Sequence, residues 1–346
     1  MKIGILFHKN PLLPSTGIDI VRLRSISKGL MENNMDTEII APVEKETVID
    51  GLIPVKPLCF LNKNRYDIIK TCYHFSMECL QDYKGPVVSR IVRVVDDTFP
   101  PRDEPMRDRL LKCQELIRTR SAAISLNNRE NKERWYRFYG KKIPVILTPT
   151  GCHEEIPPPG KNPYADKKTI LFLGSLCAGR MVTILNEMAL KLKNTAEIHF
   201  IGKNKTGLYG DPKALRHDIV RHGELPEEET WDYIRYASAG LTLATGPWPF
   251  DNDSSKIVNY LRGGLPVISE EPIVNNHLIR ETGYGKIFGH GNIDDFWVKA
   301  ADLLNRPPID KKEKVMAFMS REHSWNRRVE TYRELFEKIL QDPNFS

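Results

Sequence analysis

The amino-acid sequence predicts an α/β protein made of two Rossmann-like domains that face each other across a cleft. Strand and helix patterns alternate along both halves of the chain, and a segment rich in Pro, Gly and charge, residues 153–168, separates them. The length of 346 residues also suits two domains of ordinary size. We expect a first domain over 1–160, a second over 161–325, and a C-terminal helix over 326–346 that packs back on the first.

The first half has the pattern of a parallel sheet with crossover helices. An apolar strand at 2–7 is followed by a loop and amphipathic helix within 15–34 and by a second strand at 37–42. This order is a βαβ unit, which requires parallel strands. Further strands are expected at 66–71, 87–95, 122–126 and 144–149, and a charged helix before the last of them ends at Gly140.

The same alternation restarts in the second half. Between its strands lie helical patterns at 181–194 and 227–237 and a short one that the glycine pair at 263–264 closes. An amphipathic helix at 324–340 follows. The strands are expected at 169–174, 196–202, 239–244, 265–269 and 286–288.

Composition narrows the classes of ligand. The chain is 40% hydrophobic and 28% charged, with a net charge of +6, so we expect a sizeable core and either an anionic small-molecule ligand or peripheral contact with an acidic membrane surface. No basic patch with interleaved aromatic residues supports binding to nucleic acid.

The six cysteines form no C-x-x-C pair, which indicates reduced thiols in a cytosolic protein. No apolar run approaches the ~20 residues that span a bilayer.

The stretch SSKIVNYLRGGLPVIS, residues 254–269, predicts an anion site. Asp253 or Ser254 can cap the helix, whose first-turn N–H groups point at a ligand together with the hydroxyls of Ser254 and Ser255. Lys256 in that turn opposes the helix dipole by about 0.3–1 kcal/mol unless an anion offsets it. A solvated lysine is the alternative.

Two other loops follow strands of the second half, where ligands of parallel sheets bind. Gly174 ends one strand, and Arg180 at the mouth of the next helix can fork onto phosphate oxygens. Gly223 and Leu225 lie in a second loop, whose backbone could hold a nucleobase edge. A solvated arginine and an ordinary helix start are the respective alternatives.

Candidate residues in the first half lie in two loops. Gly17 after the first strand gives close approach to a substrate, with Arg22 nearby. Asp96 and Asp97 follow a strand and could orient a hydroxyl or act as a base. The alternative is that one of them caps a helix or stabilises a turn. The absence of G-x-S-x-G, Walker A and strict G-x-G-x-x-G motifs argues against a serine hydrolase, a P-loop kinase and a standard nicotinamide enzyme.

These segments resemble the GT-B glycosyltransferases of the family 4 type over nearly the whole chain. ILFLGSLCAGRM is similar to the family's strand-Gly-Arg-Leu…Lys-Gly segment, with Gly174 at its glycine and Arg180 at its phosphate-binding lysine. The family's paired glutamates fall on Asp251 and Asn259, and its His-Asp pair falls on Asp96 and Asp97. The 254–269 stretch resembles Lys-x-x-Glu-Tyr-Leu-Ala-x-Gly-x-Pro-Val-Val, with Lys256, Tyr260, Leu261, Gly264, Pro266 and Val267 in register.

The resemblance implies transfer of a sugar from a nucleotide diphosphate sugar, such as a UDP- or GDP-sugar, to the hydroxyl of a glycan or lipid-linked acceptor. It implies retention of configuration, no metal and no cofactor, in the cytoplasm or at the inner face of the membrane. A nucleotide-sugar epimerase of the same fold and a non-catalytic GT-B-like binding subunit are the alternatives. The implied catalytic residues are Asp96, Asp97 and Asp251, the donor residues are Gly174, Arg180, Gly223, Leu225, Ser254, Ser255, Lys256 and Asn259, and the acceptor residues are Gly17 and Arg22.

Overall fold

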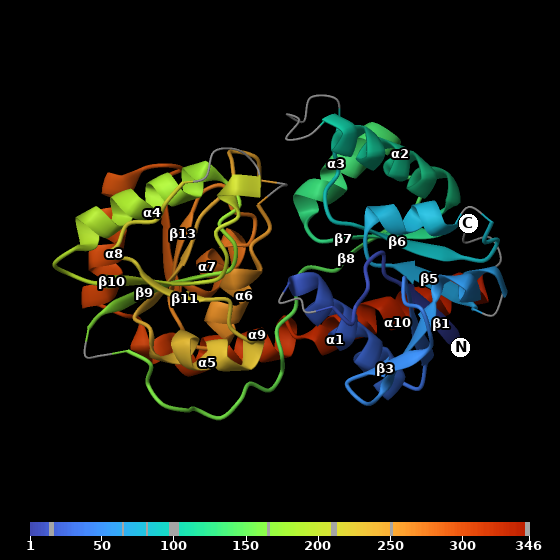
Figure 1. Cartoon of the computed structure of the whole chain (residues 1–346), viewed down its shortest axis with the longest axis horizontal. Helices are drawn as coiled ribbons and strands as arrows, with labels where there is room; N and C mark the ends of the chain where they lie inside the picture. Colours follow the sequence, from blue (N-terminus) through green and yellow to red (C-terminus); the bar gives the residue numbers. More distant parts are fainter. Residues whose placement is uncertain are drawn as a thin grey trace. The chain divides into compact units, whose positions relative to one another are not determined.

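The computed structural model describes residues 1–13, 17–63, 66–80, 82–96, 104–164, 167–208, 213–249 and 252–342. The chain divides into two compact units. The first unit comprises Met1–Gly151 and Trp325–Ser346, and the second comprises Cys152–Ser324. Each unit is a sheet with helices on both faces (Figure 1). The two Rossmann-like folds predicted from the alternation are thus confirmed.

The first unit has its sheet in the order β3-β4-β2-β1-β5-β6-β7-β8, and every strand pair is parallel except β3 with β4. Its helices α1 (Ile18–Glu32) and α10 (Trp325–Gln341) cover one face, and α2 (Glu104–Arg120) and α3 (Arg129–Tyr139) cover the other (Figure 1). The strands are β1 (Lys2–Leu6), β2 (Asp36–Ala41), β3 (Thr47–Ile49), β4 (Ile53–Pro57), β5 (Ile68–Thr71), β6 (Val87–Ile91), β7 (Ala123–Leu126) and β8 (Val145–Leu147).

Local sequence accounts for the limits of α3 but not for those of β6. Asn128 caps α3 by accepting a hydrogen bond from the N–H of Asn131, and Gly140 at φ 77° ends it as predicted. The strand expected at 87–95 stops at Ile91. Further along the same apolar run, the N–H groups of Val94 and Val95 donate to side-chain amides of α3 and α2 instead of to a strand.

The second unit has a parallel sheet in the order β11-β10-β9-β12-β13-β14. Helices α4 (Gly179–Leu192) and α8 (Ile293–Asn305) pack on one face. The other face packs against α5 (Glu227–Tyr236), α6 (Ser255–Arg262), α7 (Asn276–Thr282) and α9 (Lys312–Glu322). The strands are β9 (Thr169–Leu173), β10 (Glu197–Ile201), β11 (Val220–Gly223), β12 (Ala239–Thr242), β13 (Val267–Glu270) and β14 (Gly285–Phe288).

The Pro-rich segment belongs to the second unit in the structure. Helix α5 holds it: the N–H of Gly160 donates to Asp232 at 2.9 Å, and Arg235 donates to the carbonyl oxygen of Pro158 at 3.0 Å. The hydroxyl of Tyr164 donates to a carbonyl of the same helix at 2.8 Å. The first part of the chain therefore separates at Gly151, ahead of the boundary at residue 160 expected from composition. Composition cannot reveal hydrogen-bond partners that lie on a distant helix.

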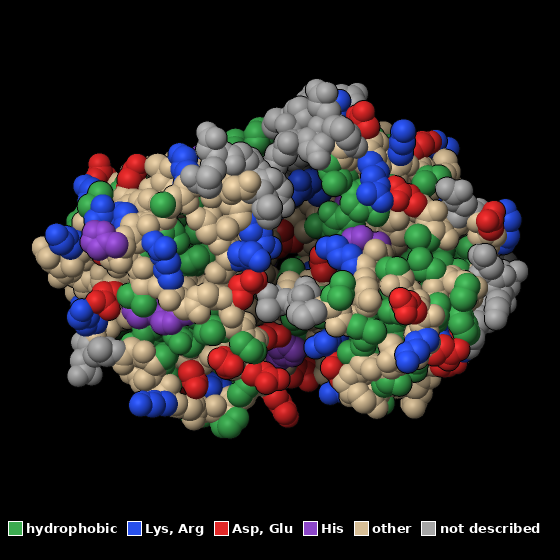
Figure 2. Space-filling model, viewed as in Figure 1, with side chains coloured by type: hydrophobic (Ala, Val, Ile, Leu, Met, Phe, Trp, Pro, Cys, Tyr) green, Lys and Arg blue, Asp and Glu red, His purple; other side chains and the backbone are tan. Residues whose placement is uncertain are grey.

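Charge is dispersed over the visible surface. Figure 2 shows Lys and Arg side chains interspersed with Asp and Glu side chains, so the net charge of +6 is not gathered into one field on that face. Among the helices of the described residues, none combines the length and the apolar character needed to cross a bilayer.

A buried histidine in the first unit makes its stability depend on pH. His74 opens a 3-10 helix (His74–Leu80) and is fully buried. Its Nε2 lies 2.8 Å from the carbonyl oxygen of Arg93, and its Nδ1 has no hydrogen-bond partner among the described residues. Burial lowers the pKa of His74 to about 4, because a second ring proton would be buried without an acceptor.

We expect the first unit to lose stability as the pH falls from about 6.5, the pKa of an unfolded histidine, to about 4. In this window His74 is protonated in the unfolded chain but stays neutral in the folded one. The free energy of unfolding therefore falls by up to about 3 kcal/mol. Urea denaturation at pH 7 and pH 4 measures this loss. His74→Phe should shrink it by that amount, and His277→Gln, at an exposed histidine, should leave it unchanged. If His74→Phe loses as much stability between pH 7 and pH 4 as the unmodified protein does, His74 is not the source of the pH dependence.

Candidate functional site

The carboxyl end of β9 forms the floor of the candidate site. Gly174 follows the strand at φ 92°, and its N–H donates to the carbonyl oxygen of Ile201 at 2.8 Å. A Cβ on Gly202 would collide with the carbonyl of Gly174, so the two loops approach as only glycine allows. A Cβ on Gly174 would lie 3.1 Å from the Cε of Lys256. The missing side chain thus leaves the space that the lysine occupies.

Lys256 is a partly buried cation without a protein anion among the described residues. Its Nζ lies 5.2 Å from the ring centroid of Phe172, and within the described residues it makes no hydrogen bond or ion pair. Burial lowers the pKa of Lys256 because no carboxylate compensates the ammonium. Tyr260, one turn on, fixes its helix to the strand: its hydroxyl accepts from the N–H of Leu173 at 2.9 Å.

The N-terminus of α6 offers further groups to an anion. Ser254 occupies the N-cap position, but its side chain makes no capping hydrogen bond. Its buried Oγ has no partner in the described part of the chain, while its own N–H donates to Asn275 at 2.6 Å. The first-turn N–H groups, the Ser254 hydroxyl and the Lys256 ammonium come from one helix end. The groups from which the sequence predicts an anion site thus lie at one helix end and lack hydrogen-bonding side-chain partners among the described residues, and the site itself stays a prediction.

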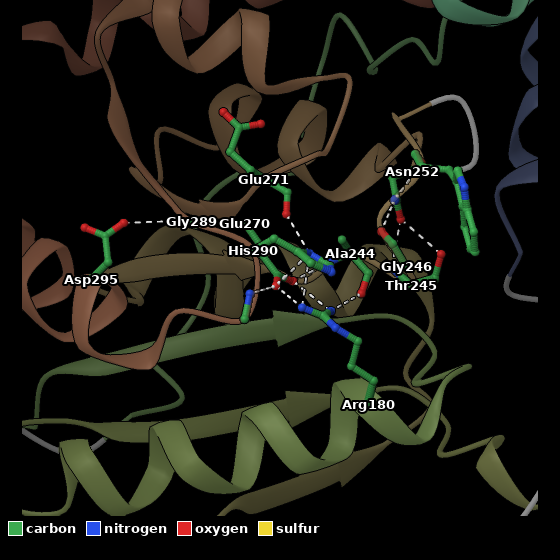
Figure 3. Close-up of polar contacts among 12 residues, drawn as sticks. Arg180, Ala244, Thr245, Gly246, Asn252, Glu270, Glu271, Gly289, His290 and Asp295 are labelled. Carbon is green, nitrogen blue, oxygen red and sulfur yellow. Dashed lines mark hydrogen bonds and ion pairs between the residues drawn. The ribbon is translucent and has the colours of Figure 1, made fainter.

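Arg180 has a different environment from the one we expected (Figure 3). Its guanidinium forms a bidentate ion pair with the fully buried carboxylate of Glu270 and also donates to the carbonyl oxygen of Ala244 at 2.8 Å. The arginine charge is already compensated by a protein carboxylate, so we do not assign Arg180 the phosphate-binding role that its likeness to the family's lysine implies. The sequence could not show this, because the partner lies 90 residues away.

Glu270 is the centre of a network that links three strand ends. Besides Arg180, it accepts hydrogen bonds from the N–H groups of Ala244, after β12, at 2.8 Å and of Gly291, after β14, at 2.7 Å. The Nδ1 of His290 lies 3.2 Å from the same carboxylate. Figure 3 shows these groups converging on Glu270 at the end of β13. The network fixes the loops that surround the carboxyl edge of the sheet.

A hollow of about 360 Å³ lies where β10 and β11 end. Gly223 lines it at φ 73°, and Lys203 and Glu224 across it form an ion pair at 3.7 Å. Leu225, in the same loop, instead packs against the core beneath α5 and α6. The hollow thus brings backbone and polar groups of this loop to one surface, and its use for a nucleobase edge stays a prediction. Its lining also includes Phe200, Gly202, Asn204, Ala214, Leu215 and Arg221.

The remaining predicted residues have varied surroundings. Asp96 is ion-paired with Arg134 of α3 at 2.7 Å, which gives it a structural partner. Asn259 is partly buried, and its side-chain amide makes no hydrogen bond to the described residues. Gly17 is the exposed N-cap of α1, and Arg22 is buried on the same helix. Asp97 and Asp251 lie outside the described residues. Ser255 is the first residue of α6.

Sequence reasoning missed Glu270 and His290. Glu270 ends the apolar run LPVISE, and a carboxylate at the carboxyl end of a buried parallel strand is itself a signal of a polar partner. His290 follows the next strand in the same way. Both could have been selected by listing the charged residues that end each predicted strand.

Comparisons with known proteins give matches among solved structures. No family model matches the chain, and no curated protein matches its sequence. Sucrose-phosphate synthase from Thermosynechococcus elongatus is similar at 12% identity and a TM-score of 0.77, over 98% of this chain and 99% of that one. HepE from Anabaena, solved in complex with UDP-glucose, is similar at 12% identity and 0.74, over 98% and 100%.

A glycosyltransferase from Rickettsia africae is similar at 14% identity and a TM-score of 0.71, over 99% of both chains. Likeness at this level of identity concerns the fold, and it extends over both units. The chain therefore has the GT-B fold, as the resemblance of its strand-loop segments implied.

Proposed function

We propose that the protein is a glycosyltransferase that moves a sugar from a nucleotide diphosphate sugar to an acceptor hydroxyl, without a metal ion and with retention of configuration. The observation that carries the proposal is the partnerless ammonium of Lys256 beside Gly174, at an α6 N-terminus whose capping hydroxyl also lacks a partner. A partly buried ammonium without a protein partner is destabilising, and an anionic ligand would compensate its charge. The solved structure of HepE with UDP-glucose, which has this fold, adds support.

In this proposal the second unit binds the donor. The diphosphate lies against Lys256, Ser254, Ser255 and the first-turn N–H groups of α6. Asn259, one turn on, holds ribose hydroxyls, and the hollow beside Gly223 holds the base. When the anomeric C–O bond breaks, negative charge grows on the departing diphosphate. Fixed N–H groups and an ammonium that needs no reorganisation stabilise that charge, which is the largest catalytic contribution we expect.

Arg180 acts indirectly in this scheme. It holds Glu270, which in turn holds the loops after β12 and β14 through the N–H groups of Ala244 and Gly291. The first unit supplies the acceptor side through Gly17 and Arg22, with Asp96, Asp97 and Asp251 as candidates to orient or deprotonate the acceptor hydroxyl. The proposed acceptor is a glycan or a lipid-linked saccharide, as in polysaccharide synthesis.

Nucleotide binding and nucleotide release test the proposal. Titration calorimetry with UDP, GDP and ADP should show binding to at least one of them, and Lys193→Met, at an exposed lysine of the same unit, should bind it equally well. The corresponding nucleotide sugars are then incubated with and without an acceptor extract. Release of the nucleoside diphosphate that depends on acceptor supports the transferase. Conversion of the sugar without acceptor indicates an epimerase, and absence of nucleotide binding overturns both.

A further inference from the structure

The first unit contains a second group of buried cations, on the sheet face that α1 and α10 cover. Lys70 of β5 and Arg90 of β6 point to this face, because their alternate neighbours Ile68 and Val88 belong to the core beneath those helices. Arg22 enters from α1. The exposed fractions are 1% for Lys70, 3% for Arg90 and 6% for Arg22.

The three cations lie around Cys72. Arg90 donates from Nη1 to the carbonyl oxygen of Cys72 at 3.0 Å. Cys72 follows Lys70 by two residues, and burial raises the pKa of its thiol while the charges of Lys70 and Arg22 oppose that shift. The cations of β5, β6 and α1 therefore share one polar region at the carboxyl edge of the sheet.

Protein anions do not balance these charges. Among the described residues, the carboxylate nearest to the group is Asp19 in the first turn of α1, whose Oδ1 lies 3.6 Å from Nη1 of Arg90. Arg22 donates to the hydroxyl of Thr150 at 3.0 Å and lies 5.6 Å from the Trp325 ring, neither of which carries a charge. Lys70 lies 4.7 Å from the ring centroid of Tyr332. Three cations thus share one carboxylate.

Two donors of the group are also left without acceptors. Nη1 of Arg22 and Nε of Arg90 are buried, and neither has a hydrogen-bond partner in the part of the chain that the structure describes. A buried guanidinium N–H that loses water without gaining an acceptor is destabilising by about 1–3 kcal/mol.

We propose that Arg22, Arg90 and Lys70 bind an oxyanion carried by the acceptor, a phosphate ester or a carboxylate. The planar guanidinium N–H groups that lack acceptors match the oxygens of such a group, and its negative charge compensates the cations, which a neutral hydroxyl cannot do. This inference rests on the proposed function, since it names the class of acceptor for the same reaction. A soluble sugar phosphate and a lipid phosphate headgroup present the same chemistry.

Binding of small oxyanions to the full chain tests the assignment. In calorimetry, inorganic phosphate and a hexose 6-phosphate should bind the unmodified protein, and the unphosphorylated hexose should bind at least tenfold more weakly. Arg90→Gln and Arg22→Gln should each weaken hexose 6-phosphate binding at least tenfold. Arg24→Gln is the matched control, because Arg24 lies on the same helix with 46% of its side chain exposed, and should bind as the unmodified protein does.

Further measurements keep the outcomes distinct. Added phosphate should raise the melting temperature of the unmodified protein more than that of Arg22→Gln, which reports binding even where a variant is less stable. Co-sedimentation with phosphatidylcholine vesicles with and without phosphatidic acid separates a lipid headgroup from a soluble phosphate as the source. Nucleotide binding should survive in both variants. If a nucleotide binds but no oxyanion does, or if the variants bind phosphate normally, this inference fails while the donor site stands.

Discussion

Replacing Glu270 with glutamine is expected to lower the free energy of unfolding of the second unit by about 3 kcal/mol. Removing one partner of a buried ion pair leaves the other charge without compensation, at a cost of about 3–5 kcal/mol. We expect the lower end of this range because 26% of the Arg180 side chain remains exposed and keeps some contact with water. The glutamine amide also has one acceptor oxygen, whereas the Glu270 carboxylate offers two to Arg180 and to the N–H groups of Ala244 and Gly291. Urea denaturation followed by tryptophan fluorescence measures the change.

Glu271→Gln is the matched control for this prediction. Glu271 is the next residue, its side chain is 39% exposed, and it pairs with Arg280 at the surface. Exposed ion pairs contribute about 0–1 kcal/mol, so this variant should stay close to the unmodified protein. If both variants lose the same small amount, Glu270 is not the centre of the network that the structure shows.

The double variant Arg180→Met, Glu270→Gln separates the unpaired charge from the lost hydrogen bonds. Removing both charges should recover part of the lost stability, since a buried pair replaced by neutral residues is often tolerated. Recovery should be incomplete, because the N–H groups of Ala244 and Gly291 still lack the carboxylate. A double variant that is less stable than Glu270→Gln would mean that the arginine contributes chiefly through packing.

The comparison of Arg180 with Lys256 shows what local sequence can establish about a site. Lys256 stands within one helix turn of the hydroxyls and N–H groups that define its role, so the stretch 254–269 contains the whole pattern. The role of Arg180 depends on Glu270, a strand and several loops away, and no spacing in the sequence connects them. Motif likeness assigned the arginine to a ligand, whereas tertiary structure assigns it to a carboxylate.

The same distinction applies to the fold. The apolar runs of β1 and β9 and the end of α3 at Gly140 are local, and the sequence predicted them. The edge pair β3 and β4 and the attachment of residues 153–164 to α5 depend on partners far along the chain. Arg90 could have been noticed, because a charge inside the apolar run VVSRIV must find a partner, although the sequence does not say which one.

Lys256→Met is expected to weaken binding of a nucleoside diphosphate by about 1.5–3 kcal/mol, the range of hydrogen bonds to charged groups. This corresponds to a roughly 10- to 150-fold higher dissociation constant. Calorimetry with the nucleotide that the unmodified protein binds gives the value, and Lys193→Met serves as the exposed-lysine control. Equal affinity in Lys256→Met and the unmodified protein would remove the diphosphate from α6.

Stability should move in the opposite direction from binding in the same variant. Lys256 has no described carboxylate partner, and its pKa is lowered by burial, so the ammonium of the free protein destabilises the fold. As the pH rises from the lowered pKa toward about 10.4, the value of an unfolded lysine, the folded state loses the proton first and the free energy of unfolding rises. Lys256→Met should be at least as stable as the unmodified protein at pH 7 and should lack this rise. A variant that loses both stability and binding would indicate that the lysine supports the fold, whereas loss of binding alone identifies a charge held in place for its ligand.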